Sequence, residues 1–310
     1  MTHSPLLFDR ALLRARLDRA APGFPAAGFL KARAAEDAVM RLEAILREFP
    51  VAVDLGARDG AFARALALSD AREKVGLLIQ TDLSERMLAG LPRGDGDGLR
   101  LVADEERLPF GDATIDLAVS TLALHWTNDL VGALIQIRRA LRPDGLFVGA
   151  LFGGATLTEL RQALLAAEDE VSGGASLRVS PFADAIDAAG LLQRAGFALP
   201  VADVDRVKVR YAHPLALLKD LRAMGETSVL IDRSRKPLSR KVLFRAMELY
   251  QERFAEPDGR VPATFEIVTV TGWAPHESQQ KPLRPGSAKM RLADALGTVE
   301  RPAGDKAGGR

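Results

Sequence analysis

The chain has 310 residues, with 42 Lys and Arg against 41 Asp and Glu, and no cysteine. At this length, 47% apolar residues can form a sizeable core, and the balanced charge argues against a dedicated nucleic-acid-binding protein. The lack of cysteine excludes disulfides, thiolate metal sites, cysteine-bound iron–sulfur clusters and thiol nucleophiles. With only four histidines, a metal site would depend on carboxylates, and we predict none.

The sequence contains no apolar stretch of the roughly 20 residues that a membrane-spanning helix needs. Its first residues include Asp9 and Asp18 and lack the apolar segment of a secretory signal. We therefore expect a cytoplasmic protein, with peripheral association with a membrane left open. The surplus of Ala, Leu, Arg and Gly is typical of a GC-rich bacterial genome.

Helical spacing of apolar residues comes first, in residues 6–17 and 29–49. Short apolar runs then alternate with helical segments, which predicts an α/β fold with a mostly parallel, doubly wound sheet covered on both faces. The expected strands are residues 51–55, 75–81, 99–103, 115–120, 146–151, 201–211 and 264–272. The expected helices between them are residues 61–68, 84–89, 129–141, 156–170, 181–195, 214–224 and 238–254, and R-P-D-G at residues 142–145 is expected to end one of them.

This pattern predicts three parts. Residues 1–48 form an N-terminal helical cap, and residues 49–280 form the α/β domain, with a helical insertion at about residues 213–256. Residues 281–310 carry seven Lys or Arg against three Asp or Glu, together with Pro and Gly, which predicts a basic flexible tail.

Acids follow three of the predicted strands. Asp54, Gly56 and Gly60 come at and after the first, Asp82 ends the second, and Asp104 follows the third. In an open parallel sheet, ligands bind beyond the carboxyl ends of the strands, and glycines let a ligand approach the backbone closely. Asp82 can accept hydrogen bonds from two ribose hydroxyls, and Asp104 is placed to accept one from an adenine amino group. The spacing therefore predicts an adenosine-containing cofactor at this edge.

A dinucleotide-dependent oxidoreductase is the alternative for the same sheet. Its phosphate loop is G-x-G-x-x-G, whereas Gly56-Ala57-Arg58 lacks the middle glycine. Asp59, at the start of the next helix, would repel a pyrophosphate. Both features argue against NAD.

The ordered motifs D-L-G-x-x-x-G, D-L-S-x-x-M-L, A-D-E-x-x-L-P-F and L-R-P-D-G, within residues 54–145, resemble those of class I S-adenosylmethionine-dependent methyltransferases. The resemblance implies their seven-stranded Rossmann-like sheet and S-adenosylmethionine as cofactor. It also implies the binding residues: Asp54, Gly56 and Gly60 at the methionine part, Asp82 and Leu83 at the ribose and adenine, Asp104 and Glu105 at the adenine edge, and Ser120 at the reacting end.

One position departs from that family. Arg58 stands where the methyltransferases commonly have a second glycine. Its side chain is expected either to point outward or to fold over the carboxylate of the cofactor. The substitution also leaves open a weakened cofactor site.

The segment L-H-W-T-N-D-L, residues 124–130, follows the fourth strand and should lie beside the reacting end of the cofactor. His125 could position a substrate or act as a base, and Trp126 could form a wall of the pocket. The structural alternative is that Trp126 packs, that His125 satisfies a backbone group, and that Asn128 or Asp129 caps the next helix. The sequence leaves both interpretations open.

Longer stretches resemble the complex I assembly factor 5 family over nearly the whole chain, to about residue 287. The matching pieces include L-F-D-R at residues 7–10, L-H-W-T-N-D-L, F-G-G-A-T-L-T-E-L-R at residues 152–161 and M-G-E at residues 224–226. Mitochondrial members are peripheral assembly proteins that are understood to hydroxylate an arginine in a complex I iron–sulfur subunit. The resemblance implies an enzyme that binds S-adenosylmethionine and modifies that arginine, with the complex I subunit as its partner.

Glu159, at the start of a predicted helix in the F-G-G-A-T-L-T-E-L-R piece, is the natural partner for a guanidinium. We therefore expect His125, Trp126 and Glu159 at the catalytic end of the site. The alternative for Glu159 is that it merely complements the helix dipole.

Two other functions stay open. The carboxyl methyltransferase of biotin synthesis, which esterifies a malonyl group on acyl carrier protein, has a similar helical insertion and a similar tryptophan-containing segment. Arginines such as Arg206, Arg210 and Arg245 could dock that acidic carrier or form a solvated surface. The third alternative is a non-catalytic complex I assembly chaperone. Its best support is Arg58, because this residue could weaken the cofactor site. Oxidation of an unactivated C–H bond needs an oxidant, and the sequence shows no metal cluster and no flavin motif.

Overall fold

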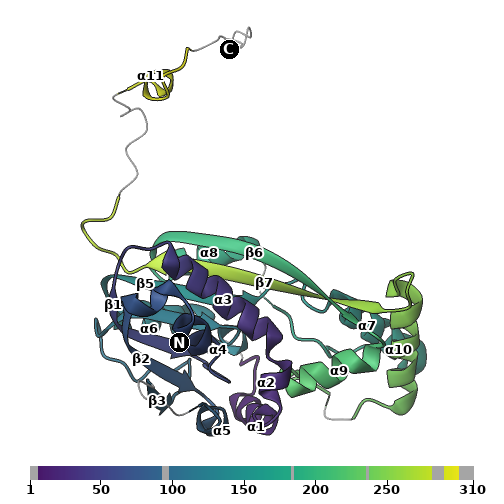
Figure 1. Cartoon of the computed structure of the whole chain (residues 1–310). Helices are drawn as coiled ribbons and strands as arrows, with labels where there is room; N and C mark the ends of the chain where they lie inside the picture. The colour runs from purple at the N-terminus through teal and green to yellow at the C-terminus, as the bar shows by residue number, and fades with distance from the viewer. Residues whose placement is uncertain (1–5, 93–97, 183–184, 235–236, 281–289, 300–310) are drawn as a thin grey trace. The chain divides into compact units, whose positions relative to one another are not determined.

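A seven-stranded sheet in the order β3-β2-β1-β4-β5-β7-β6 forms the centre of the computed structural model (Figure 1). Neighbouring strands from β3 to β5 are parallel, whereas β7 runs antiparallel to both β5 and β6. This confirms the predicted mostly parallel, doubly wound sheet. The strands are β1 (Phe49–Leu55), β2 (Val75–Asp82), β3 (Leu99–Val102), β4 (Ile115–Thr121), β5 (Leu141–Phe152), β6 (Ala198–Tyr211) and β7 (Val261–Trp273).

The structure describes residues 6–92, 98–182, 185–234, 237–280 and 290–299. One compact unit extends to Pro275, and a second, small unit begins at His276 and contains helix α11 (Leu292–Ala295). The predicted tail at residues 281–310 lies mostly outside the described residues.

Alternate residues of the central strands enter different hydrophobic clusters. On β4, Leu117 and Val119 pack with α3 (Phe29–Glu43) and α4 (Ala61–Ala67) on one face. Ala118 packs with α6 (Leu130–Ala140) and α8 (Ala185–Arg194) on the other. Because successive side chains of a strand point to opposite faces, a strand buried on both sides needs apolar side chains on both, as Leu117, Ala118 and Val119 at the centre of β4 provide.

The helices near the carboxyl ends of the strands begin at polar side chains. Asp9 caps α1 (Arg10–Ala20), Ser84 caps α5 (Glu85–Ala89), and Asp129 caps α6, in each case by accepting a backbone N–H of the first turn. A short helix, α2 (Phe24–Ala27), lies between α1 and α3 in the chain.

The helix predicted at residues 129–141 ends before R-P-D-G, as expected, but no separate loop joins it to the next strand. β5 begins at Leu141, directly after α6, so residues 142–145 lie within an irregular start of the strand. Asp144 has a φ of 63°, and its N–H donates to Ala274 O, while Gly145 O accepts from the N–H of Ala274. These contacts with the end of β7 hold the bulged backbone in the sheet, so no separate loop is needed.

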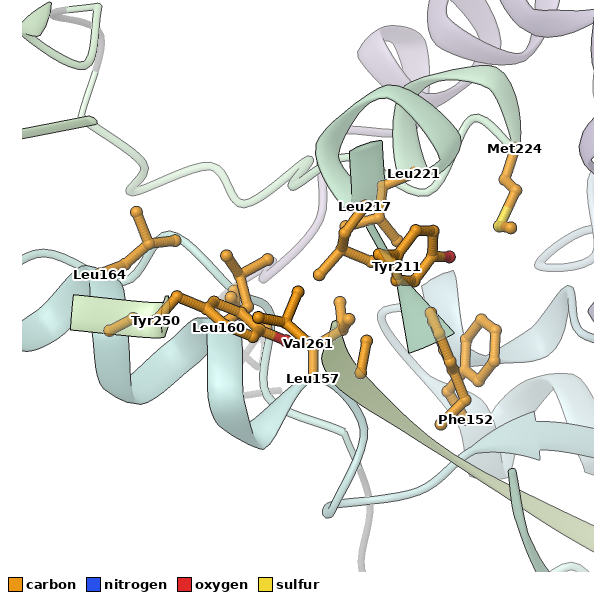
Figure 2. Packing of buried hydrophobic residues seen from close by; sticks show 14 of the residues in the cluster. Phe152, Leu157, Leu160, Leu164, Tyr211, Leu217, Leu221, Met224, Tyr250 and Val261 are labelled. Atoms are coloured by element: carbon orange, nitrogen blue, oxygen red, sulfur yellow. The ribbon is translucent and has the colours of Figure 1, made fainter. Parts of the chain in front are cut away.

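Past the sheet, β6 and β7 continue toward a group of helices (Figure 1). These are α7 (Thr158–Ser172), α9 (Pro214–Ala223) and α10 (Arg240–Phe254), of which α9 and α10 lie between β6 and β7 in the chain. Leu157, Leu160, Leu221, Tyr250 and Val261 belong to the core that joins them (Figure 2). This core supports the apolar cavity described below.

Candidate functional site

The three acids predicted to bind a cofactor lie at one edge of the sheet. Asp54 is next to last in β1, Asp82 ends β2, and Asp104 follows shortly after β3. In the register of the sheet, Asp54 pairs with Gln80 and Asp82 pairs with Val102. Because parallel strands bring their carboxyl ends to the same edge, the strand pattern alone gathers these acids. We call this edge, formed by the ends of β1 to β4, the carboxyl edge.

The turn after β1 requires its glycines. Gly56 and Gly60 have φ values of 75° and 74°, in the left-handed region that favours glycine. A Cβ on Gly56 would collide with the Cβ of Ala123, and one on Gly60 would come within 2.9 Å of Leu91 Cδ2. Larger side chains at either position would therefore disturb the fold as well as a bound ligand.

Arg58 neither points outward nor lies free beside the turn. Its side chain is only 2% exposed, and Nη1 donates to Asp82 Oδ2 at 2.8 Å, while its backbone N–H donates to the same oxygen at 2.9 Å. The other oxygen of Asp82 accepts from the N–H of Ser84 at 2.8 Å. Burial opposes the charge of Arg58, but Asp82, Glu105 and Glu226 outweigh it and raise the pKa of the guanidinium. The acid predicted to hold the ribose is thus already paired within the chain.

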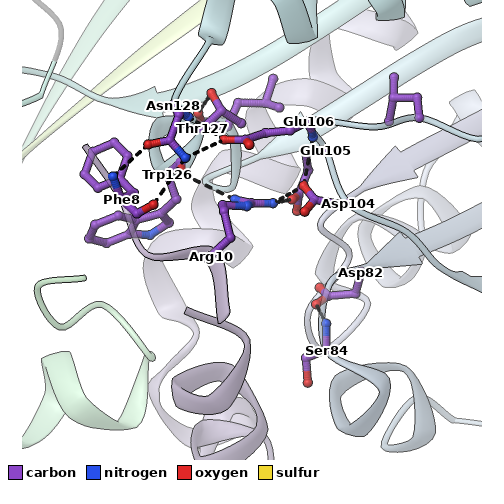
Figure 3. Close-up of polar contacts among 12 residues, drawn as sticks. Phe8, Arg10, Asp82, Ser84, Asp104, Glu105, Glu106, Trp126, Thr127 and Asn128 are labelled. Atoms are coloured by element: carbon purple, nitrogen blue, oxygen red, sulfur yellow. Dashed lines mark hydrogen bonds and ion pairs between the residues drawn. The ribbon is translucent and has the colours of Figure 1, made fainter. Parts of the chain in front are cut away.

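A second arginine binds the acids predicted at the adenine edge. Arg10 Nη2 donates to Asp104 Oδ1 at 2.5 Å and to Glu105 Oε2, and Nη1 donates to Trp126 O at 3.3 Å (Figure 3). Sequence reasoning did not single out Arg10, although it closes the L-F-D-R motif. The acids predicted to bind the cofactor at the carboxyl edge are therefore paired with two arginines of the same chain.

Residues 6–10, which we call the N-terminal strap, are fixed to the segment after β4. Asn128 Oδ1 accepts from the N–H groups of Leu7 and Phe8 at 2.8 and 2.7 Å (Figure 3). The ring of Phe8 meets that of Trp126 edge-on, with 5.3 Å between ring centroids. Asn128 thus binds the strap, and Asp129 caps the next helix. A capping role for one of these two residues was the structural alternative that the sequence left open.

A buried lysine lies beneath the turn after β1. Lys31 Nζ, from α3, donates to Gly56 O, Thr121 O and Thr121 Oγ1 at 2.6–2.7 Å. Burial lowers the pKa of Lys31 to about 8 and raises that of Asp54 to about 6, while each charge attracts the other. Neither carboxylate oxygen of Asp54 has a hydrogen-bond partner within the described part of the chain. In the sequence, the only sign of this buried lysine is its spacing, which places Lys31 on the apolar face of the predicted cap helix.

The remaining predicted cofactor residues lie nearby. Ser120 Oγ, in β4, donates to Leu55 O at 3.0 Å. Leu83 follows β2 and packs with Met87 and residues of α1. Glu105 is buried behind Arg10.

The residue types at the carboxyl edge fit S-adenosylmethionine, whereas the space beside them is small. The two unpartnered oxygens of Asp54 suit the ammonium group of an amino acid. The cavity lined by Lys31, Arg58 and Glu226 measures only about 20 Å³. Sites for ligands of this size typically measure about 300–1,000 Å³. The buried side chain of Arg58 lines this cavity, so a cofactor that occupied the cavity would have to displace it.

A larger cavity, of about 260 Å³, has Trp126 in its lining. Its walls are mostly apolar and come from α7, α9 and the segment of Phe182, with Leu160, Leu164 and Leu221 among them. Figure 2 shows these leucines at the edge of the core between α7 and α9. We call this space the apolar cavity.

Glu226 lines both the apolar cavity and the small cavity beside Arg58. Its Oε2 accepts from Trp126 Nε1 at 3.0 Å and lies 3.2 Å from His125 Nε2. The ring of His125 packs against Phe152 and Phe182. The structure therefore brings the predicted His125 and Trp126 together with a carboxylate that sequence reasoning missed, although the M-G-E motif contains it.

Glu159 lies elsewhere. Its carboxylate accepts from the backbone N–H of Thr264 at 3.1 Å and from Thr264 Oγ1 at 2.5 Å. It does not line the apolar cavity. These contacts link the first turn of α7 to β7, so the predicted catalytic role of Glu159 gains no support from its surroundings and stays a prediction.

Among the described residues, no three His, Asp or Glu side chains are grouped as a metal ion would require. In the same part of the chain, no helix has both the length and the apolar character to cross a membrane.

Comparisons with known proteins agree with this geometry. Residues 53–149 match the methyltransferase domain family. The chain is 41% identical over 290 residues to the rat mitochondrial arginine-hydroxylase NDUFAF5, covering 93% of this chain and 83% of the relative. It is 32% identical over 309 residues to a malonyl-[acyl-carrier protein] O-methyltransferase of Methylovorus, covering 97% of each. A crystal structure of a candidate methyltransferase from Bacillus halodurans superposes with a TM-score of 0.54 at 16% identity, covering 78% of this chain and 99% of that one, which supports the fold alone.

Proposed function

We propose, because this chain belongs to the arginine-hydroxylase NDUFAF5 family, that it is an S-adenosylmethionine-binding enzyme that modifies an arginine of a complex I iron–sulfur subunit. The observation that carries the proposal is the position of the apolar cavity. It shares Glu226 with the small cavity beside Arg58, so an acceptor side chain in the apolar cavity would lie close to the carboxyl edge.

The carboxyl edge would hold the cofactor. We assign Asp54, Gly56 and Gly60 to its amino-acid part, Asp82 and Leu83 to its ribose, Asp104 and Glu105 to its adenine, and Ser120 to its reacting end. S-adenosylmethionine, when bound, supplies an activated methyl group. The ion pairs of Arg58 with Asp82 and of Arg10 with Asp104 support the assignment. Each arginine donates hydrogen bonds to an acid, which shows that these acids are placed to accept them, as they would from the hydroxyls and amino group of a cofactor.

The residues of the chain contribute binding and orientation of the acceptor. Leu160 and Leu221 would pack against the methylene groups of an inserted side chain, and Trp126 would exclude water from the side that faces the cofactor. Hydroxylation of a C–H bond needs an oxidant from outside the polypeptide, since no side chain of the described residues carries an oxygen-activating group.

For its setting, we propose a cytoplasmic protein that meets complex I at the membrane surface. The alternative partner, acyl carrier protein, is less well supported by the arginines expected to dock it. Arg206 bonds Glu266, Arg210 bonds Glu256 and Asp258, and Arg245 bonds Glu170, so these positive charges are already compensated.

Mass spectrometry of complex I subunits from a deletion strain tests the function. We expect an arginine of an iron–sulfur subunit to lose a 16-dalton modification, and the plasmid-borne gene to restore it. A deletion strain that needs added biotin while complex I assembles normally would instead identify the carrier-protein methyltransferase.

The chaperone alternative requires a variant that folds but binds no cofactor. Gly56→Arg is unsuitable, since Gly56 has a positive φ and no room for a side chain. Arg58→Gly with Asp82→Ala removes both partners of one ion pair and leaves no unpaired charge. Restoration of complex I activity by this double variant would support a non-catalytic chaperone.

A further inference from the structure

We infer that Glu226 is the residue that recognises the acceptor, and that it selects a guanidinium over a carboxylate. This inference rests on the proposed function, because it names the group that the apolar cavity receives. Glu226 follows α9, where Gly225 has a φ of 75° and the N–H of Glu226 donates to Leu221 O at 2.9 Å. The turn directs the carboxylate toward Trp126 and His125, away from the helix.

One oxygen of Glu226 is fixed and the other is available. Oε2 accepts from Trp126 Nε1 and contacts His125 Nε2, at 3.0 and 3.2 Å. Within the described part of the chain, Oε1 has no hydrogen-bond partner. A carboxylate held in one orientation can accept a charge-assisted hydrogen bond from a guanidinium at its free oxygen. His125 and Trp126 therefore act as positioning residues, through Glu226.

The volume and lining of the cavity suit one arginine side chain. Its volume of about 260 Å³ is at or below the range typical of small-molecule sites, which favours a single side chain over a second small-molecule ligand. Leu160, Leu164, Leu221 and Phe182 provide an apolar channel for the methylene stem. Two hydroxyls in the lining, Ser180 Oγ and Ser228 Oγ, are buried without a partner among the described residues, so both can bond an inserted polar group.

The charged groups that line the cavity are two arginines and the carboxylate of Glu226. Arg178, in the lining, is paired with Glu168 at 2.6 Å, and Arg222 is exposed near the end of α9. Glu226 is the carboxylate of the lining, and only 12% of its side chain is exposed. A malonyl carboxylate that reached this point would meet a like charge in a poorly solvated place, which is unfavourable. A guanidinium would instead form a charge-assisted pair.

The test compares two peptides that differ in one group. A blocked peptide of neutral residues carries either arginine or citrulline, which has the same shape without the charge. We expect the wild-type protein to bind the arginine peptide about ten- to a hundred-fold more tightly, as measured by calorimetry. Glu226→Gln should abolish this preference, Glu226→Asp should retain part of it, and the control Glu248→Gln, on the exposed face of α10, should retain all of it.

The inference is overturned if Glu226→Gln, shown to be folded by its thermal unfolding curve, keeps the arginine preference. It is also overturned if the wild-type protein does not distinguish the two peptides. The outcomes separate it from the proposed function. Loss of arginine modification in the deletion strain, restored by the gene for Glu226→Gln, would leave the function standing and remove Glu226 from recognition. If the arginine preference depends on Glu226 but the deletion strain loses no modification, Glu226 would stand as the recognition residue and the proposed function would fall.

Discussion

The guanidinium of Arg58 and the carboxylate of Asp82 form a buried ion pair, with 2.8 Å between Nη1 and Oδ2. Asp82 is the acid that ends β2, where we assign the ribose of the cofactor, and Arg58 has a φ of 54° that a glycine would adopt without strain. If Asp82 binds the ribose as we propose, Arg58 occupies the place of the ligand. Cofactor binding would then have to break this pair, which would lower the apparent affinity.

Arg58→Gly should tighten the binding of S-adenosylhomocysteine by about ten-fold or more, since the ligand no longer displaces a charge-assisted hydrogen bond. Calorimetry measures the change. Arg64→Ala, which removes an exposed arginine of the next helix, is the matched control and should leave the affinity unchanged. Equal affinity of Arg58→Gly and the wild-type protein would show that Arg58 does not compete with the cofactor.

Asp82→Ala should lower the free energy of unfolding by about 3–5 kcal/mol, because it leaves the buried Arg58 without its partner. Adding Arg58→Gly should recover most of that loss but not the binding of S-adenosylhomocysteine. Urea unfolding of the wild-type protein, both single variants and the double variant gives the coupling energy. Additive effects of the two substitutions would contradict the proposed competition at Asp82.

The charge of Asp54 predicts a dependence of stability on pH. Its folded-state pKa of about 6 lies above the unfolded value of about 3.9, so the native state binds more protons than the unfolded state between these values. The contribution of Asp54 is thus fully present below about pH 4 and is lost as pH rises through about 6. Relative to Asp54→Asn, which does not titrate, the wild-type protein should lose unfolding free energy from pH 4 to pH 7. Parallel curves for the two proteins would refute the raised pKa.

Arg10→Ala should loosen the N-terminal strap. Arg10 joins it to Asp104, Glu105 and the carbonyl of Trp126, so its loss leaves the hydrogen bonds to Asn128 and the backbone hydrogen bonds to Val229 and Ile231. Hydrogen exchange at the N–H groups of Leu7 and Phe8 should accelerate about ten-fold, by loss of roughly 1.5 kcal/mol or more. Arg14→Ala, an exposed change on α1, is the control and should leave their exchange rates unchanged.

Glu159→Gln decides between the two roles of this carboxylate. Its bonds to Thr264 predict a loss of about 1–2 kcal/mol in unfolding free energy, since an amide accepts these bonds more weakly than a carboxylate. Thr264→Val should produce a loss of similar size that is not additive with it. A lost preference for the arginine peptide, at unchanged stability, would instead establish Glu159 as the acceptor-binding residue.

The sequence by itself determined the sheet and the position of the carboxyl edge. Apolar runs that end in Asp54, Asp82 and Asp104 place these acids together through a local rule, because parallel strands bring their carboxyl ends to one edge. The same rule located Gly56 and the segment of His125 and Trp126, and the family resemblance followed from that ordered series of motifs.

Only the tertiary structure decided which charges meet. Arg58 turns inward to Asp82, Lys31 reaches the turn after β1 from another helix, and Glu226 meets Trp126 across 100 residues of sequence. Glu159, which the sequence offered as the guanidinium partner, bonds Thr264 across 105 residues. No local pattern encodes such pairs, because a buried charge takes the partner that packing brings within hydrogen-bond distance, and the packing depends on the whole chain.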